Sequence, residues 1–205
     1  MSNTRKDRER NFKKREILEA AKCLFAEKGY HLTTLEEIAD KAEFGKGTIY
    51  NYFKNKDDIY YEIIKVIFEE YSAMLECFSN KEIGFRDFVL ETTRATFKYA
   101  VENSCTMMMV LRARIDLFYS EEKGKRAVIR KHNMRSLDIF KQKIEEGIKK
   151  GEINEIDPEK FVFLYRSMVF PFMQVMFFSR ITKKADPDEM AEFVTDIIFN
   201  GIAKK

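Results

Sequence analysis

The sequence predicts an all-helical protein, and three observations lead to that fold class. The chain of 205 residues contains only 3 prolines and 8 glycines. Apolar residues recur at three-and-four spacing over long stretches, which is the period of a helix with one buried face. The sequence has no pair of alternating apolar runs joined by Asn-Gly or Asp-Gly, the strongest hairpin signal. Because 45% of the residues are hydrophobic and 14% aromatic, such helices can bury a core.

Two helices are predicted near the N-terminus. The first spans about residues 12–28 and ends at Gly29, which stands where a helix stop is expected. Its buried stripe is Ile17, Ala20, Ala21, Leu24 and Phe25. The second begins near Leu35, because Thr34 and Glu37 have the spacing of a capping box. Its apolar face is Leu35, Ile38, Ala39 and Ala42.

A third, short helix is predicted at residues 46–53, after a tight turn. Ile49 and Phe53 lie four apart and are expected to point inward. The remaining side chains form an outward surface of hydrogen-bonding groups: Lys46, Thr48, Tyr50, Asn51 and Tyr52. Two helices joined in this way are typical of a helix-turn-helix, whose second helix enters the DNA major groove. A solvated helical hairpin would have the same spacing.

The residue types in this stretch support the helix-turn-helix interpretation beyond what the spacing shows. They include Thr33-Thr34, Ile38-Ala39, Gly47-Thr48-Ile49-Tyr50, Tyr52-Phe53 and Lys56. From about Lys14 to Ile64 the chain closely resembles the DNA-binding segment of the TetR family of bacterial transcriptional regulators. The resemblance implies an N-terminal three-helix helix-turn-helix domain followed by a helical ligand-binding and dimerisation domain. Two positions depart from the family pattern: Glu43 stands where glycine is usual, and Gly45 where a small hydroxyl residue is usual.

A DNA-binding surface follows from the residue pattern and the resemblance together. We expect Tyr50 and Lys56 to contact phosphates, and Lys46 and Thr48 to lie nearest the bases or the flanking backbone. Asn51 faces either a base edge or its own helix. The complete predicted set is Thr34, Lys46, Gly47, Thr48, Tyr50, Asn51, Tyr52 and Lys56.

The excess positive charge lies in the first quarter of the chain. Residues 1–54 carry 12 Lys and Arg against 9 Asp and Glu, whereas residues 55–205 carry 25 of each. The basic residues are densest at the N-terminal end, where only Asp7 and Glu9 oppose them: Arg5, Lys6, Arg8, Arg10, Lys13, Lys14 and Arg15. They predict a basic arm for phosphates or a minor groove, although an ordinary solubilising tail explains them equally well.

Downstream, a long helix is predicted from Lys56 to about Cys77, followed by three helices within residues 81–157. The breaks between these three fall near Asn103-Ser104 and at residues 120–124. Residues 161–178 are apolar almost all round, with a kink expected at Pro171. A membrane span is rejected for this run because Arg166 lies inside it. A final helix opens at Pro187.

The last two helices suggest a homodimer, because a helix that is apolar nearly all round must be buried on several sides. Pairing with a second copy would form an intersubunit four-helix bundle. The predicted interface is Met190, Phe193, Val194, Ile197 and Ile198. We therefore expect a DNA-binding domain with its basic arm at residues 1–54, and an effector-binding and dimerisation domain at residues 55–205.

Large soft side chains in the second domain suggest an apolar effector cavity, since methionine fills irregular space and repacks easily. An ordinary core would have the same composition. An acyl chain or a lipophilic drug would fit such a cavity. The candidate residues are Phe97, Met107, Met108, Met109, Leu111, Arg112, Phe118, Tyr119, Phe163, Arg166, Phe172, Met173, Gln174 and Met176.

No pattern for catalysis, a cofactor or a metal is found in the sequence. Gly45-Lys46-Gly47-Thr48 lacks the glycine spacing and the preceding strand of a phosphate loop. His31 and His132 have no partners at ligand spacing. The three cysteines and the polar N-terminus favour a reducing cytoplasm. The sequence thus predicts a repressor that a small apolar effector releases from a palindromic operator. The alternative is a DNA-bound architectural or cell-division adaptor without an effector.

Overall fold

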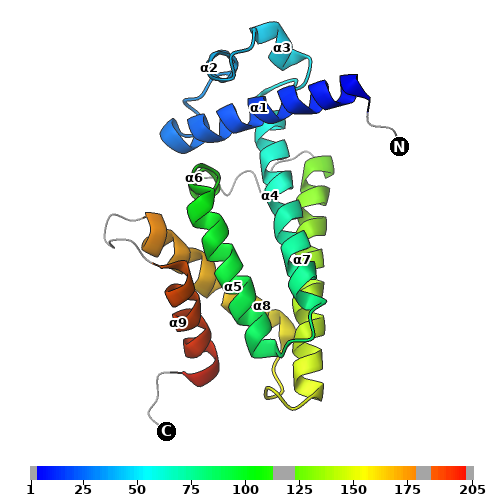
Figure 1. Ribbon diagram of the computed structural model, residues 1–205, viewed down its shortest axis with the longest axis vertical. Helices are drawn as coiled ribbons and strands as arrows, with labels where there is room; N and C mark the ends of the chain where they lie inside the picture. The colour runs from blue at the N-terminus through cyan, green and yellow to red at the C-terminus, as the bar shows by residue number, and fades with distance from the viewer. Residues whose placement is uncertain (1–3, 113–122, 179–185, 202–205) are drawn as a thin grey trace. The chain divides into compact units, whose positions relative to one another are not determined.

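The computed structural model describes residues 4–112, 123–178 and 186–201. Every regular element in these ranges is helical (Figure 1), so the predicted all-helical class is confirmed. The elements are α1 (Arg5–Lys28), α2 (Leu35–Lys41), α3 (Lys46–Tyr50), α4 (Lys56–Ser79), α5 (Phe85–Glu102), α6 (Ser104–Arg112), α7 (Lys123–Lys149), α8 (Pro158–Met173), the π-helical turn η2 (Gln174–Phe178) and α9 (Pro187–Asn200).

The chain divides into two compact units. The first unit comprises Met1–Ile67 and Ser104–Arg126, and the second comprises Phe68–Asn103 and Ala127–Lys205. Helix α4 therefore begins in the first unit and ends in the second. The boundary that the sequence suggested at residue 54 stays a prediction.

The first unit is built around small and branched apolar side chains of α1, α2 and α3. The predicted inward residues Ile17, Ile38 and Ile49 are fully buried, and Phe53 is nearly so. Phe25 and Tyr60 add an aromatic contact with ring centroids 5.5 Å apart. In this unit α1 packs against α2 and α6, and α2 packs against α3. The short helices thus owe their positions to burial against α1, since helices of five and seven residues are too short to be stable alone.

The second unit has an aromatic core. Phe88 and Phe140 are buried and meet edge to face at 5.2 Å, and Tyr165 lies 5.1 Å from Phe140. The buried hydroxyl of Tyr165 shares a hydrogen bond of 2.9 Å with that of Thr93. Helix α5 packs along α9 (Figure 1), and Arg94 of α5 forms an ion pair with Asp188 of α9 at 2.8 Å.

Several predicted helix features differ from the structure: α3, for example, ends at Tyr50 rather than at residue 53. The first helix begins at Arg5 rather than near residue 12, because Thr4 and Asp7 form a capping box that starts it earlier. The basic residues that were predicted to form an arm therefore lie on the first turns of α1. In α8 the helix continues past Pro171 and ends at Met173, where the wider turn η2 takes over. Pro171 removes one backbone donor, and the change of helix type follows shortly after it.

Glycine and proline mark several helix ends, among them the predicted stop at Gly29 and the predicted start at Pro187. Gly29 and Gly151 have positive φ angles of 86° and 72°, which glycine tolerates at helix ends. Pro158 and Pro187 open α8 and α9. Among the described residues, no helix has the length and hydropathy needed to cross a membrane.

Candidate DNA-binding surface

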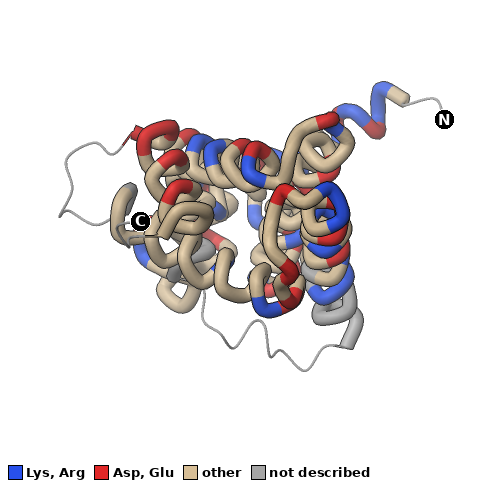
Figure 2. Tube along the Cα trace, turned by 90° about the horizontal axis from the view of Figure 1, so that it is seen from below, with Lys and Arg blue, Asp and Glu red and all other residues tan. Residues whose placement is uncertain are grey.

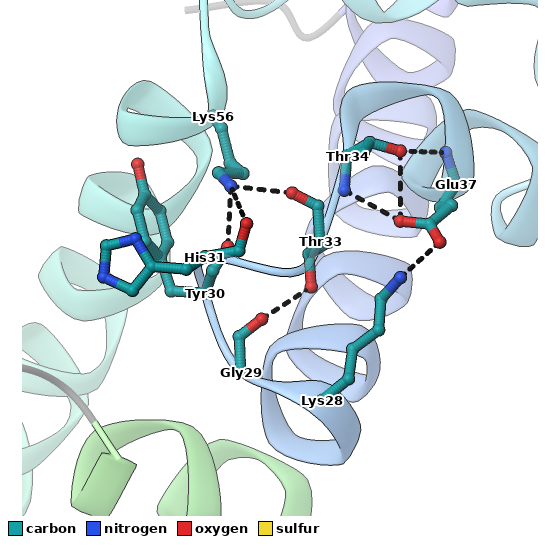
Figure 3. Close-up of polar contacts among 8 residues, drawn as sticks. All are labelled: Lys28, Gly29, Tyr30, His31, Thr33, Thr34, Glu37 and Lys56. Atoms are coloured by element: carbon teal, nitrogen blue, oxygen red, sulfur yellow. Dashed lines mark hydrogen bonds and ion pairs between the residues drawn. The ribbon is translucent and has the colours of Figure 1, made fainter.

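The start of α2 is fixed by the predicted capping box, which is confirmed (Figure 3). The Glu37 amide donates to the Thr34 hydroxyl at 3.2 Å, and the Thr34 amide donates to the Glu37 carboxylate at 2.8 Å. The same carboxylate accepts a hydrogen bond from Lys28 at the end of α1. This lysine and the two Thr34 donors lower the pKa of Glu37 to about 2. The carboxylate therefore stays ionised at neutral pH and ties α1 to α2.

The turn after α2 forces a residue with a side chain into a left-handed conformation. Glu43 has φ of 57°. Its amide donates to the Asp40 carbonyl at 3.1 Å, and the Phe44 amide donates to the Ala39 carbonyl at 2.9 Å. This pair of bonds is the Schellman ending of a helix, where glycine is usual. The sequence showed Glu43 at a position where glycine is usual, and the turn forms with Glu43 in the left-handed conformation.

We expect Glu43→Gly to raise the free energy of unfolding by roughly 0.5–1 kcal/mol. A left-handed residue with a Cβ costs about 1–2 kcal/mol, and the added freedom of glycine in the unfolded chain offsets part of the gain. The matched control is Asp40→Gly, three residues earlier at an exposed position of α2. This substitution should lower the free energy of unfolding. Urea unfolding of both variants measures the difference. Equal destabilisation by the two glycines would show that the turn is not strained.

Helix α3 buries one side and exposes the other. Its N-cap residue Gly45 makes no side-chain bond, as the missing hydroxyl led us to expect. Ile49 is fully buried, whereas Tyr50 is 50% exposed. The predicted surface residues Lys46, Gly47 and Asn51 are exposed with Thr34, and Thr48 and Tyr52 are half-buried. The structure therefore places Thr34 at the start of α2, and the other predicted residues on α3 and in the turn directly after it.

One residue of this surface that the sequence did not single out is Glu36. Its carboxylate pairs with the ammonium of Lys46, and both side chains are about half exposed. The hydrogen bond from Lys46 lowers the pKa of Glu36, and the same contact raises the pKa of Lys46. Lys46 must leave this carboxylate to meet a phosphate. The partners are ten positions apart on different helices, so helical spacing alone could not have identified the pair.

Lys56 has internal partners that the sequence did not reveal (Figure 3). Its ammonium donates to the carbonyl oxygens of Tyr30 at 2.6 Å, Thr33 at 2.7 Å and His31 at 3.3 Å. The ammonium also lies 4.4 Å from the ring centroid of Tyr30. Burial, together with the charge of Lys28, lowers the pKa of Lys56. Since an ammonium has three protons to donate, Lys56 holds the loop between α1 and α2; its predicted phosphate contact stays a prediction.

The basic residues of α1 are only partly free to meet a polyanion. The first turns of the helix carry charges of both signs (Figure 2). Lys13 pairs with Glu9 at 2.8 Å, and Lys14 pairs with Glu62 of α4 at 2.7 Å. Arg5, Arg8 and Arg10 are exposed. Contacts of these arginines with phosphates stay a prediction.

The predicted effector residues fall in both units. Met107 and Met109 of α6 are buried in the first unit, and Phe97 and Met173 are buried in the second. Met108, Phe172 and Met176 are half-buried, whereas Gln174 is exposed and Phe163 is 63% exposed. The side chains of Leu111 and Arg112 lie outside the described part, as do Phe118 and Tyr119.

Arg166 is the polar residue of this set with an unmet hydrogen bond. Its Nε is buried and has no partner among the described residues. Its guanidinium lies near Tyr71 and offsets part of the rise that burial causes in the pKa of that phenol. A buried donor without a partner costs free energy, so Arg166 is suited to a ligand oxygen.

A pocket of about 690 Å³ lies elsewhere in the second unit, beside the start of α5 and the loop after α7. Its lining includes Phe85, Glu152, Phe161, Leu164 and Met168. None of the predicted effector residues lines it, although Ile197 and Ile198 of the predicted dimer interface do. Among the residues that the structure describes, no group of three or more His, Cys, Asp or Glu could hold a metal ion.

Comparison with known proteins decides the family. The model of bacterial regulatory proteins of the tetR family matches residues 17–63. The HTH-type transcriptional regulator YhgD of Bacillus subtilis is 32% identical over 163 residues, which cover 77% of this chain and 83% of that protein. The chain belongs to the TetR family of bacterial transcriptional regulators. The resemblance inferred from residues 33–56 is thereby confirmed, and the family is one of DNA-binding regulators.

Two further comparisons extend over most of the chain. The fatty acid metabolism regulator protein of Bacillus subtilis is 28% identical over 194 residues, covering 93% of this chain and 95% of that one. The crystal structure of FadR from Bacillus subtilis in complex with stearoyl-CoA has a TM-score of 0.77 at 22% identity, covering 92% of this chain and 99% of that one. At this identity the structural likeness establishes the fold: a helix-turn-helix domain followed by a helical domain.

Proposed function

We propose that this TetR-family regulator is a homodimeric repressor that leaves a palindromic operator when a small apolar effector binds. The observation that carries the DNA-binding part is the outer side of α3, where Lys46, Thr48 and Tyr50 present polar groups while Ile49 fixes the helix to the core. A short helix held in this way presents its polar side to a groove without losing its own packing. Thr34, Gly47, Asn51 and Tyr52 complete the proposed surface, and Lys56 belongs to it through the loop that it holds.

Gly47 offers a direct test of this surface. Its φ is not in the left-handed region, and a methyl group added there would meet no atom within 4 Å. The fold therefore does not require glycine at this position, and Gly47→Ala should raise the free energy of unfolding by about 0.5–1 kcal/mol through helix propensity. DNA close to α3 would meet the new methyl group. We expect a loss of DNA affinity of about tenfold or more.

The control for Gly47→Ala is Gly45→Ser, which has equally open surroundings and adds a capping hydroxyl at the helix start. It should stabilise the fold slightly and keep DNA affinity within about threefold. Fluorescence anisotropy with a duplex selected from random DNA measures the DNA affinity of both variants. If Gly47→Ala binds as tightly as the parent, α3 does not approach DNA at Gly47.

The proposed effector is an acyl chain with an anionic or polar head. Two features support it: the buried Nε of Arg166 without a partner, and the buried apolar side chains of Phe97 and Met173 in the same unit. Apolar walls with a few polar anchors are typical of small-molecule sites. The names of the fatty acid metabolism regulator and of the stearoyl-CoA complex favour the same ligand class. A core without an effector, as in an architectural DNA-bound protein, is the alternative.

The experiment is to titrate acyl-CoA thioesters of increasing chain length with and without operator DNA. A ligand that releases the protein prefers the unbound conformation, and a preference of about 100-fold corresponds to ~2.7 kcal/mol. Because coupling is reciprocal, operator DNA must weaken the ligand by the same factor. Helix α4, which belongs to both units, is the proposed connection. Equal ligand affinities in both titrations would remove the regulatory role, and no binding at all would favour the architectural alternative.

A further inference from the structure

Two cysteines far apart in the sequence meet inside the first unit. Cys23 lies on α1 and Cys105 on the first turn of α6, 82 positions later. Their sulfur atoms are 3.7 Å apart. Helices α1 and α6 pack against each other within this unit, so the approach is part of a helix contact. A disulfide requires sulfur atoms about 2.0 Å apart, so side-chain rotation must bring the two sulfur atoms closer before they bond.

We propose that Cys23 and Cys105 form an oxidisable dithiol, which peroxides convert to a disulfide between α1 and α6. The inference does not depend on the proposed effector or operator. The two sulfurs differ in access: Cys105 is exposed and Cys23 is half-buried. Burial is also the main cause that raises the pKa of the Cys23 thiol. Cys105 is therefore the sulfur that an oxidant reaches first, and Cys23 is the resolving thiol.

The chemistry balances with one molecule of hydrogen peroxide. The Cys105 sulfur attacks the peroxide, the O–O bond breaks, and the products are a sulfenic acid and one water. The Cys23 sulfur then attacks the Cys105 sulfur, the S–O bond breaks, and hydroxide leaves and takes up the Cys23 proton as a second water. The two sulfurs lose two electrons in total, and the peroxide gains them. A thiol reductant reverses the change by exchange.

The bond would act on the DNA-binding unit as a clamp. It would join the helix that supports α2 and α3 to α6, which a single residue, Asn103, separates from the end of α5. Closing a loop of this length restricts the unfolded chain strongly. The oxidised protein should therefore unfold at a higher temperature than the reduced protein. Its helices α1 and α6 should also stay in contact under conditions in which they separate in the reduced protein.

The exposed Cys77 provides the matched control. The full chain is treated with peroxide, its remaining thiols are blocked with N-ethylmaleimide, and it is digested with trypsin. The three cysteines then lie in three different peptides. Cleavage after Lys22, Lys28, Lys98 and Arg112 places Cys23 in peptide 23–28 and Cys105 in peptide 99–112, while Cys77 lies in peptide 66–81. We expect a cross-linked pair of peptides 23–28 and 99–112 from the parent and from Cys77→Ser. Cys105→Ser should give none.

The stabilisation that the disulfide would give is a second property that can be measured. Oxidation should raise the melting temperature of Cys77→Ser by about 5 °C or more, and dithiothreitol should reverse the rise. Amide hydrogens of residues 104–112 should exchange at least about tenfold more slowly when oxidised. Neither change should occur in Cys105→Ser. Recovery of Cys23 as its maleimide adduct after peroxide treatment, with Cys105 oxidised alone or cross-linked to Cys77, would overturn the proposal.

Discussion

Lys56→Ala is expected to weaken DNA binding about tenfold or more without changing how the affinity depends on salt. The ammonium of Lys56 donates to the carbonyls of Tyr30 and Thr33, and both bonds are partly buried. Alanine removes the ammonium from both carbonyls, although the Tyr30 carbonyl still accepts from the Thr33 amide at 3.4 Å. The loss of partly buried bonds of this kind costs roughly 1–3 kcal/mol. The loop they belong to leads directly into Thr34, which caps α2. We therefore expect lower affinity through a displaced α2 and a lower melting temperature.

The slope of log affinity against log salt separates this role from a phosphate contact. Loss of one phosphate contact lowers the slope by ~0.9. Lys46→Ala is the comparison, because Lys46 is on the exposed side of α3 and its ion pair with Glu36 lies at the surface. It should lower the slope by that amount and leave the melting temperature nearly unchanged. A lower slope for Lys56→Ala would instead support the phosphate contact predicted from the sequence.

Local signals explain why much of the fold was predictable. The capping box of Thr34 and Glu37, the helix stop at Gly29 and the opening proline of α9 all act within four residues along the chain. The start of α1 was missed although its signal is equally local. Thr4 and Asp7 also have capping-box spacing, but the charged residues after them have no apolar stripe to mark a helix.

The parts of the site that were not predictable depend on contacts between distant residues. Lys56 reaches carbonyls 23 to 26 positions away, and backbone carbonyls leave no signature in a sequence. Cys23 and Cys105 meet only because α6 returns to α1. The strained turn was predictable in part. The sequence showed that Glu43 is unusual at its position, whereas the hydrogen bonds that keep it left-handed are visible only in the structure.

Phe193→Glu is expected to raise the dimer dissociation constant about 1,000-fold or more. Phe193 is 53% exposed on α9, although its ring stacks on Phe172 at 5.9 Å. Leu164 of α8, in the same unit, is 61% exposed. We propose that these two side chains belong to one interaction surface, and that its occupant is the same surface of a second copy. An isologous interface would then bury both glutamates without partners, at a cost of several kcal/mol.

Sedimentation measurements across a range of concentrations test the interface. The glutamate variant should sediment as a monomer and keep its helical content, because Phe193 is already half in water and its loss removes little of the core. The control is Glu192→Ala, whose side chain is exposed beside Phe193 and reaches Arg94 only at 3.5 Å; it should remain dimeric.

Since a palindrome is read by two linked α3 helices, the monomer should also lose most of its operator affinity. A variant that stays dimeric would move the interface away from Phe193, and a monomer with undiminished affinity would separate DNA binding from dimerisation.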